Sequence, residues 1–525
     1  MLSSIILLSE RSIRCFSTVR VRFAPSPTGD LHLGGLRTAL YNYAFAKHEN
    51  GTFILRIEDT DRTRLVPGSI EQIQNVLSTF KLIPDEGPNQ GGPYGPYIQS
   101  QRTELYKELT KTLIDKGAVF PCFCSQHRLQ WLKSHSNGSK SNGSYDNRCL
   151  YIDPEEAKDR IQKGEPYVLR LKPPKEDIHI YDEIKGDICF KPQQIDSQVL
   201  IKSDGLPTYH FANVVDDHYM KISHVIRGEE WLSSTPKHVM LYKAFGWEPP
   251  KFVHIPLLLN EQKQKLSKRE GHSSVLHLLE EGYSCESILS FISTLGWSGI
   301  DNSIIDKKNA IYTLEDICKY FDISRLNSSS AIVDPKRLQN ENHLYISNLP
   351  KTKEGMELFY SRVTPYITAL DKQLQSHKDQ YIHNNIQNIQ NKAFIERLIS
   401  LCSSRCHYMS DFDGFLRSIF LPPWELESKI YNTYSIPQSI IEKSSSLLSS
   451  LSSSSIPSFT AQNIGSVLST LPSEYSLSNS QFLIALRVLI TGNKKGFSLF
   501  DTLEMIGRDE CIYRIQHFLE NKNKN

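Results

Sequence analysis

A turn near the start of the chain combines residue types that suit phosphate binding. Residues 19–24 alternate like a strand, residues 25–29 hold two prolines and a glycine that end it, and residues 31–43 continue with helical spacing. His32, Gly34 and Gly35 lie where this helix begins. Glycine there lets a ligand approach the backbone, and the first N–H groups of a helix face an anion. The sequence therefore predicts a strand–turn–helix unit that handles phosphate.

Two further segments carry groups that could act with this unit. The mostly apolar residues 53–57 predict a buried parallel strand. The largely acidic residues 58–61 follow it, at the position where open sheets bind ligands. Residues 262–271 have the polar, basic character of a mobile loop. Taken alone, such a loop is more often a solvated charged face, and His32 is more often an ordinary helix-start histidine.

The composition excludes several classes of protein. The chain has 525 residues, which at about 150 residues per domain predicts three or four domains. Its 60 Lys+Arg against 58 Asp+Glu give a net charge of +2, which excludes a polybasic nucleic-acid coat but not a local basic groove. No apolar run approaches the roughly 20 residues that cross a bilayer, so we expect a soluble protein with no membrane partner. The 10 cysteines are sparse and indicate reduced thiols or a metal site.

Residues 1–16 have the composition of a targeting segment. They carry Arg11 and Arg14 among serines and aliphatic residues, with Glu10 as the one acid. This basic, serine-containing and acid-poor pattern predicts a mitochondrial transit peptide and hence a location in the mitochondrial matrix. The alternative is a frayed N-terminus without function.

Several long motifs resemble those of the glutamyl-tRNA synthetases, which are class I aminoacyl-tRNA synthetases. The segments that carry the resemblance are 22–35 (RFAPSPTGDLHLGG), 56–61 (RIEDTD), 205–213 (GLPTYHFAN), 225–230 (VIRGEE) and 265–269 (KLSKR). The resemblance is dense from about residue 19 to about residue 297 and returns more faintly in 486–492 and 496–500. Two long motifs in the right order are much stronger evidence than a lone H-x-G-G.

The resemblance implies an α/β fold. We expect a Rossmann-type parallel-sheet catalytic domain of the class I synthetases with an α+β insertion, followed by a mostly α-helical anticodon-binding region. The expected boundaries are a transit peptide at 1–16, the first catalytic half at 17–120, an inserted acceptor-stem-binding region at 121–205, the second catalytic half and stem-contact region at 206–330, and the helical anticodon-binding region at 331–525.

The implied chemistry explains the residue types in these motifs. A carboxylate attacks the α-phosphate of ATP, so the protein needs no nucleophile and acts by positioning and by neutralising charge on phosphate oxygens. The residues expected to act on the phosphates are His32, Gly34, Gly35, Lys265, Ser267 and Lys268. The residues expected to meet ATP are His32, Glu230 and Lys268. Mg²⁺ is expected from the triphosphate chemistry and not from a visible set of ligands.

An acidic amino acid requires cations and one acid in its site. Arg22 and Arg227 are the candidates for its carboxylates, because a guanidinium binds a carboxylate bidentately. Glu58 is the candidate for its ammonium group. The resemblance adds further residues of the glutamate pocket, namely Phe23, Ala24, Ser26, Tyr209, His210, Phe211, Ala212 and Asn213. The alternative for Glu58 is a simple ion-pair network with the arginines.

Three cysteines form a candidate zinc site. Cys122, Cys124 and Cys149 match positions where some relatives bind structural zinc with a fourth ligand two residues after the last cysteine. That position is Tyr151, a poor zinc ligand, although His127 could complete the set. Three reduced structural thiols are the alternative.

The resemblance predicts a mitochondrial glutamate–tRNA ligase. Its substrates would be ATP, L-glutamate and tRNA(Glu), with tRNA(Gln) left open, and we expect a monomer. A glutaminyl-tRNA synthetase, a glutamyl-queuosine synthetase and a catalytically inactive tRNA-binding protein are the alternatives. The long tail and the Lys268 loop count against the queuosine enzyme, the bacterial-type arrangement against the glutaminyl branch, and the retained charged residues against an inactive binder.

The C-terminal third is less informative. Residues 313–317 predict a capped helix start, and the periodicity of 395–402 and 482–490 predicts helices. The serine-rich stretch 444–458 and the Asn- and Gln-rich stretch 384–391 indicate loops or a drift in composition. No residue there can be assigned to an anticodon base.

Overall fold

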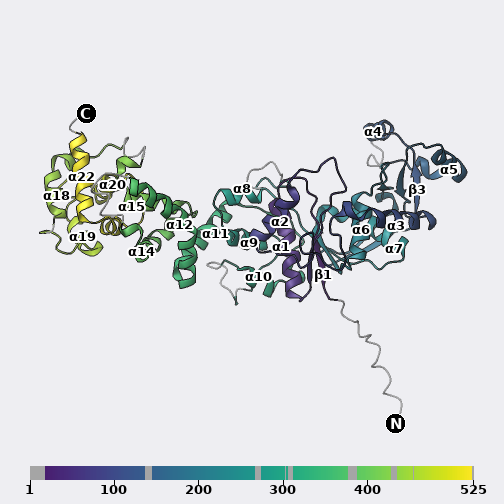
Figure 1. Cartoon of the computed structure of the whole chain (residues 1–525), viewed down its shortest axis with the longest axis horizontal. Coiled ribbons are helices and arrows are strands. Elements are labelled where there is room, and N and C mark those ends of the chain that lie inside the picture. Colours follow the sequence, from purple (N-terminus) through teal and green to yellow (C-terminus); the bar gives the residue numbers. More distant parts are fainter. Residues whose placement is uncertain are drawn as a thin grey trace, which may run out of the picture. The chain divides into compact units, whose positions relative to one another are not determined.

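The strand, turn and helix predicted near the N-terminus are present in the computed structural model (Figure 1). Strand β1 (Arg20–Phe23) leads through the turn into helix α1 (Leu33–His48), and β2 (Thr52–Leu55) then runs parallel to β1. The helix begins after His32 because the His32 side chain accepts a hydrogen bond from the backbone N–H of Gly35. This arrangement confirms the predicted order of elements.

The structure describes residues 18–135, 145–266, 274–301, 303–304, 311–376, 387–426, 434–452 and 454–522. The chain divides into two units. The first comprises Met1–Leu279 and Ile288–Pro335, and the second comprises Glu280–Ser287 and Lys336–Asn525.

A four-stranded sheet forms the centre of the first unit. Its order is β6 (Gly186–Phe190), β5 (Ile178–Asp182), β9 (Lys251–Ile255), β8 (His224–Gly228), with β8, β9 and β5 parallel. A hydrogen bond of 2.9 Å from the Ser223 N–H to the Arg20 carbonyl joins the start of β8 to β1. The β5–β6 hairpin falls inside the range predicted as an insertion, yet it extends the sheet that carries β8 and β9. Asp182 at the end of β5 is thereby brought next to β9.

A second, antiparallel sheet belongs to the same unit. It consists of β3 (Val119–Cys122), β4 (Val168–Leu171) and β7 (Val199–Ile201). Residues of this sheet share a hydrophobic core with α3 (Thr103–Asp115), α6 (Tyr209–Tyr219) and α7 (Thr235–Phe245). The mixture of sheets and helices agrees with the predicted α/β class.

The remaining elements before Pro335 are short. They include α2 (Ser69–Thr79), α4 (Gln126–Ser134), α5 (Pro154–Gln162), the 3₁₀ helix η4 (Glu229–Ser234), β10 (Leu258–Leu259), α8 (Val275–Glu280), α9 (Cys285–Ser293), α10 (Leu314–Tyr320) and β11 (Ala331–Ile332). The predicted cap is confirmed at α10, where Thr313 accepts from the Asp316 N–H and the Asp316 carboxylate accepts from the Thr313 N–H.

The second unit is helical, as expected for the C-terminal region. Its helices are α11 (Pro335–Asn348), α12 (Lys353–Ser376), α14 (Lys392–Cys402), α15 (Asp411–Phe420), α17 (Gln438–Glu442), α18 (Ser444–Leu451), α19 (Ala461–Leu468), α20 (Asn479–Thr491), α21 (Leu499–Ile506) and α22 (Arg508–Lys522). Figure 1 shows α22 among α18, α19 and α20. One apolar core holds these helices together. Every helix contributes buried residues to it, although the first turns of α11 do not.

The expectation of a loop at the serine-rich stretch is wrong for residues 444–451. This segment forms α18, with Leu447 and Leu451 almost fully buried in the apolar core. The two leucines are four residues apart and therefore share one helix face, and packing of that face outweighs the weak helix propensity of the serines. The helices predicted at 395–402 and 482–490 are confirmed as parts of α14 and α20.

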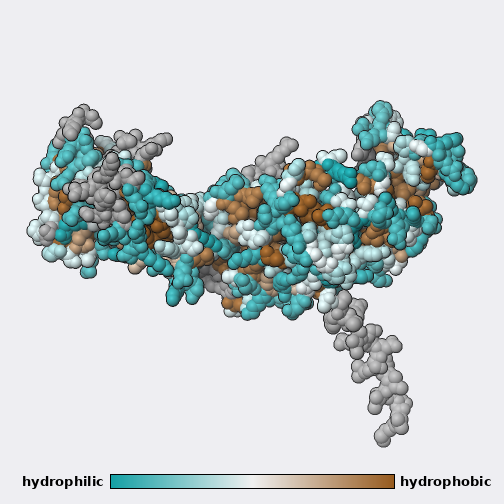
Figure 2. All heavy atoms as spheres, viewed as in Figure 1, coloured by the Kyte–Doolittle hydropathy of each residue, from teal (hydrophilic) through white to brown (hydrophobic). Residues whose placement is uncertain are grey.

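Hydrophilic side chains are interspersed with hydrophobic ones over the face drawn in Figure 2. Among the described residues, no helix is long and apolar enough to span a membrane. The nine cysteines within the described ranges are not joined by disulfide bonds.

Candidate active site

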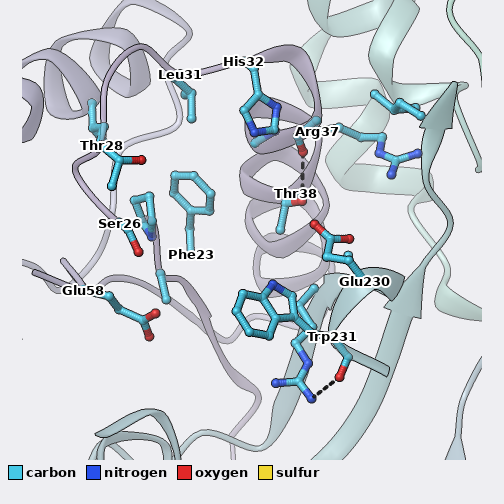
Figure 3. A pocket seen from close by; sticks show the side chains of 18 of the residues that line it. Phe23, Ser26, Thr28, Leu31, His32, Arg37, Thr38, Glu58, Glu230 and Trp231 are labelled. Carbon is cyan, nitrogen blue, oxygen red and sulfur yellow. Dashed lines mark hydrogen bonds between the residues drawn. The ribbon is translucent and has the colours of Figure 1, made fainter. Parts of the chain in front are cut away.

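A cavity of about 420 Å³ opens at the turn between β1 and α1. Thirteen of the residues singled out in the sequence line it: Arg22, Phe23, Ala24, Ser26, His32, Gly34, Gly35, Glu58, Tyr209, Asn213, Arg227, Glu230 and Lys265. They come from β1 and the turn after it, α1, the segment after β2, α6, β8, η4 and the segment after β10. In the view of Figure 3, Glu58 lies near Ser26 on one side of the cavity, and Glu230 lies near Trp231 on another.

The start of α1 forms the end of the cavity that is suited to phosphate. The Gly35 N–H donates to His32 Nδ1 at 3.1 Å, so the neutral ring carries its proton on Nε2, where it can be donated to a phosphate oxygen. A Cβ placed on Gly34 would lie 3.1 Å from the His32 ring. Glycine at position 34 therefore keeps the imidazole in place as well as opening the helix start to a ligand.

Glu58 is a buried acid that faces the cavity. Its carboxylate accepts hydrogen bonds from Arg56 Nη2 at 3.0 Å and from Asn213 Nδ2 at 3.3 Å. Burial raises the pKa of Glu58, and the charges of Arg56 and Arg22 oppose this increase. A bound ammonium group would add a further counter-charge, so the site suits a primary amine.

Arg22 and Arg227 are held differently. The Arg22 guanidinium pairs with the buried carboxylate of Asp217, at 3.0 Å from Nε to Oδ1 and 3.3 Å from Nη2 to Oδ2. Arg56 also donates to Asp217 Oδ1, at 2.6 Å. Burial alone would raise the pKa of Asp217, but Arg22 and Arg56 hold it below its usual value. Arg227 instead contacts imidazole, hydroxyl and carbonyl acceptors.

The residues expected from helix α6 separate into two groups. Tyr209 and Asn213 are four residues apart, share one helix face and line the cavity. Phe211 and Ala212 are fully buried in the hydrophobic core between α6 and the antiparallel sheet. The Nδ1 atom of His210 lies 3.2 Å from Nε2 of His238, so this ring is turned toward α7 and does not line the cavity.

The residues expected to close on the triphosphate are only partly described. Lys265 lines the cavity beside Leu258, and Glu230 lies on the other side in η4. Ser267 and Lys268 lie outside the described residues.

Sequence reasoning missed several residues that shape the cavity. Trp231 lines it, with its ring centroid 4.1 Å from that of Tyr209. Arg37 lies on the buried side of α1 and donates to the carbonyls of Leu295 and Pro256. Asp217 could have been noticed, because two adjacent acids at 216 and 217 in an apolar helix need buried cations. Arg37 and Trp231 carry no such signal in the sequence.

The three cysteines of the candidate metal site lie together. The Sγ atoms of Cys122, Cys124 and Cys149 are all within 4.8 Å of one another, which fits the thiolate set of a zinc site. Tyr151, the expected fourth position, is 82% exposed, whereas Tyr145 lies with its hydroxyl 3.8 Å from Cys124 Sγ. Burial raises the pKa of Cys124 to about 11.

Comparisons with known proteins assign the chain to a class. Residues 18–340 match the family model described as tRNA synthetases class I (E and Q), catalytic domain, and residues 358–519 match an anticodon binding domain. These matches assign both units to the class I tRNA synthetases.

Named relatives narrow this class. The chain is 37% identical over 514 residues to a glutamate–tRNA ligase of Clostridioides difficile, covering 96% of this chain and 99% of the relative. It is 38% identical over 504 residues to one of Clostridium botulinum, covering 95% and 97%. A crystal structure of a glutamate tRNA ligase from Elizabethkingia meningosepticum in complex with its amino acid aligns with a TM-score of 0.78 and 33% identity, covering 96% and 99%. The chain belongs to the glutamate–tRNA ligase family.

Proposed function

We propose that the protein activates L-glutamate with ATP, forming glutamyl-AMP and diphosphate, and transfers the glutamate to the 3′ end of tRNA(Glu). One observation carries this proposal. A single cavity holds a buried acid suited to an ammonium group, two arginines suited to carboxylates and a helix start suited to an anion. These groups match glutamate and a nucleotide phosphate side by side.

Glutamate binds at the Glu58 side of the cavity. The Glu58 carboxylate takes the ammonium group, and Arg22 and Arg227 take the carboxylates. Ala24 and Ser26 lie beside the amino acid, since both line the cavity next to Glu58. Desolvation in this buried position strengthens each charge interaction.

ATP binds at the start of α1. His32 donates from Nε2 to a phosphate oxygen, and the backbone at Gly34 and Gly35 lets the nucleotide approach the helix. Glu230 contacts the nucleotide from η4, and Lys265, Ser267 and Lys268 close on the triphosphate. Mg²⁺ neutralises phosphate charge in this reaction class.

The reaction then needs positioning and charge neutralisation. An α-carboxylate oxygen of glutamate attacks the α-phosphorus of ATP, the bond to the bridging oxygen breaks, and diphosphate leaves. A hydroxyl of the terminal ribose of tRNA next attacks the carbonyl carbon, releases its proton, and AMP leaves. Among the described residues, none that lines the cavity is needed as a covalent nucleophile in either step.

Several finer assignments extend this proposal. Residues 1–16 direct the chain to the mitochondrial matrix, residues 121–205 contact the tRNA acceptor end, and residues 331–525 bind the anticodon. The enzyme acts as a monomer. A fusion of residues 1–16 to a fluorescent protein that stays in the cytosol would contradict the targeting assignment.

Cys122, Cys124 and Cys149 hold a structural Zn²⁺ in this proposal, with the Tyr145 hydroxyl as the nearest oxygen donor. The ion would tie the segment around Cys149 to β3. Elemental analysis of the purified protein should find about one zinc per chain, and Cys149→Ser should lower it. A zinc-free wild-type protein would leave three structural thiols.

Aminoacylation of separate tRNAs tests the central proposal. Purified protein from Ser17 onward is supplied with ATP, Mg²⁺ and labelled glutamate or glutamine, with mitochondrial tRNA(Glu) and tRNA(Gln) in separate reactions and Lys268→Ala as the control. Glutamate charging of tRNA(Glu) alone indicates a discriminating ligase, and charging of both tRNAs a non-discriminating one. Glutamine charging would favour the glutaminyl branch, and tRNA binding without any charging would favour an inactive binder.

A further inference from the structure

Arg227 is surrounded by neutral acceptors. Its guanidinium offers five N–H groups. Their acceptors are His254 Nε2 at 3.0 Å from Nε, His238 Nδ1 at 3.2 Å and Tyr209 Oη at 3.4 Å from Nη1, and Thr235 Oγ1 at 2.9 Å and the Trp231 carbonyl at 3.4 Å from Nη2. No ion pair within 4.0 Å joins Arg227 to a carboxylate of the described residues. Its positive charge is therefore balanced less directly than that of Arg22.

The contact with His254 fixes the tautomer of that ring. A guanidinium only donates hydrogen bonds, so His254 Nε2 must be the unprotonated acceptor, and a neutral ring then carries its proton on Nδ1. The Nδ1 atom lies 2.7 Å from Oδ2 of Asp182, and both side chains are fully buried. The Asp182 carboxylate also accepts from the backbone N–H groups of Ile184, Lys185 and His254. It is thus a fixed acceptor for the His254 proton.

The contact with His238 connects Arg227 to a further histidine, His210. His238 Nδ1 accepts from Arg227, so its proton lies on Nε2, 3.2 Å from His210 Nδ1. Burial lowers the pKa of His254 and of His210 to about 4 and that of His238 well below its usual value. All three rings are therefore neutral near pH 7, as acceptance from a guanidinium requires.

We propose that the pairs Asp182–His254 and His210–His238 are positioning residues that hold Arg227 through neutral imidazole nitrogens. Its charge, and the two N–H groups that make only long contacts of 3.4 Å to Tyr209 and Trp231, are then left for the substrate's side-chain carboxylate. A carboxylate in place of either imidazole would orient Arg227 equally well but would cancel part of its charge. Because the imidazoles that hold Arg227 are neutral, its positive charge is kept, and the site therefore favours an acidic amino acid over its amide. This inference rests on the proposed function, because it assumes glutamate as the substrate.

Three variants separate positioning from simple packing. His254→Leu removes the acceptor, whereas His254→Gln returns an amide oxygen that can accept from Arg227. His224→Gln is the matched control: its ring is also partly buried with a pKa lowered to about 4, on the same strand β8 as Arg227, but it contacts Ser223 and Phe45. Thermal unfolding of each variant checks that it folds.

The KM values for glutamate and ATP are the kinetic readout. For His254→Leu we expect the KM for glutamate to rise about tenfold or more, with the KM for ATP and the inhibition constant of glutamine changed less than about threefold. His254→Gln should recover most of the loss, and His224→Gln should match the wild type. The proposal would be overturned if the KM for glutamate rose equally in His254→Leu and His254→Gln. It would also be overturned if the KM values for glutamate and ATP rose in parallel.

A second readout does not depend on activity. Histidine-selective ¹⁵N NMR at pH 7 reports which ring nitrogen carries the proton, and the His254→Gln and His238→Gln spectra assign the signals. We expect the Nδ1–H tautomer at His254 and the Nε2–H tautomer at His238. The opposite tautomers, or protonated rings, would refute the positioning scheme even in an active enzyme. A wild-type protein that charges no tRNA but shows these tautomers would instead count against the proposed function alone.

Discussion

Buried arginines occur in both units, but their partners differ. Arg22 and Arg227 line a cavity, with Arg22 paired to the Asp217 carboxylate and Arg227 held by neutral acceptors. Arg514 in α22 is fully buried and donates to the carbonyls of Ser418, Ile419 and Ile490 and to Glu510. Those three carbonyls lie in the last turns of α15 and α20, where helices leave acceptors without intrahelical partners. Arg22 and Arg227 of the first unit thus line the cavity proposed to bind glutamate, whereas Arg514 of the second unit joins helices.

The largest effect should come from the acid in the cavity. Glu58→Gln keeps the shape of the side chain but removes the charge that meets the substrate's ammonium group. We expect kcat/KM for glutamate to fall about 1000-fold, which corresponds to roughly 4 kcal/mol of lost interaction. Steady-state aminoacylation measures this, with thermal unfolding as the control for folding. A fall of less than about tenfold would mean that Glu58 only balances Arg56 and Arg22.

The matching change in the second unit should act on stability. Arg514→Leu leaves three helix-end carbonyls and Glu510 without their buried donor, so we expect unfolding free energy to drop by about 3–5 kcal/mol. Lys163→Met, which removes an exposed ion pair with Asp159, should change it by less than about 0.5 kcal/mol. Urea unfolding followed by circular dichroism measures both. Similar values for the two variants would contradict the helix-joining role.

Crowding at the start of α1 gives a prediction of intermediate size. The Cβ of Gly34→Ala would press on the His32 ring at 3.1 Å and narrow the approach to the helix. We expect kcat/KM for ATP to fall about 10- to 100-fold, or roughly 1.5–3 kcal/mol, with stability little changed. An ATP titration of aminoacylation checks this. Unchanged ATP kinetics would show that phosphate binds elsewhere.

The stability of the wild type and that of Glu58→Gln should depend differently on pH. Its folded-state pKa is raised above the ordinary 4.5 because of burial, so the folded protein binds more protons than the unfolded chain. Wild-type stability should therefore decline, relative to Glu58→Gln, as pH rises from about 4.5 through the raised pKa. Unfolding midpoints of both proteins between about pH 4 and pH 7 test the sign. A wild type that gains stability relative to the variant over this range would contradict it.

The smallest effect is expected at a glycine whose Cβ position is unoccupied and uncrowded. Gly414 lies inside α15, and a Cβ there would meet no atom within 4 Å. Gly414→Ala should therefore stabilise the second unit by about 0.5–1 kcal/mol through helix propensity. Urea unfolding measures it. A destabilised variant would show that position 414 requires glycine, as position 34 does.

Much of the first unit could be predicted from local patterns. The alternation of 19–24, the prolines at 25 and 27 and the glycines at 34 and 35 place β1, the turn and α1, because these residue types act on their own backbone. The lining residues of that turn followed directly. Tyr209 and Asn213 were expected together with their neighbours, and only the helical period separates them from Phe211 and Ala212.

Long-range partners could not be predicted in the same way. Asp182 reaches His254 because β5 pairs with β9, and no local pattern encodes which strands become neighbours. The adjacent acids at 216 and 217 indicate a need for buried cations, but the same limit hid that Arg22 and Arg56 are the partners of Asp217. In the second unit, the serine-rich sequence of α18 gave no sign of a helix, because its two leucines are buried only through contact with the surrounding helices.

The preference for glutamate over glutamine should depend on the positive charge of Arg227. The ratio of their kcat/KM values in tRNA charging is measured for the wild type and for Arg227→Gln, which keeps hydrogen-bonding capacity but removes the positive charge. We predict that the wild type prefers glutamate by about 1000-fold or more and that the variant loses at least about tenfold of this preference. An unchanged ratio in a folded, active variant would contradict recognition of the substrate's charge by this cavity.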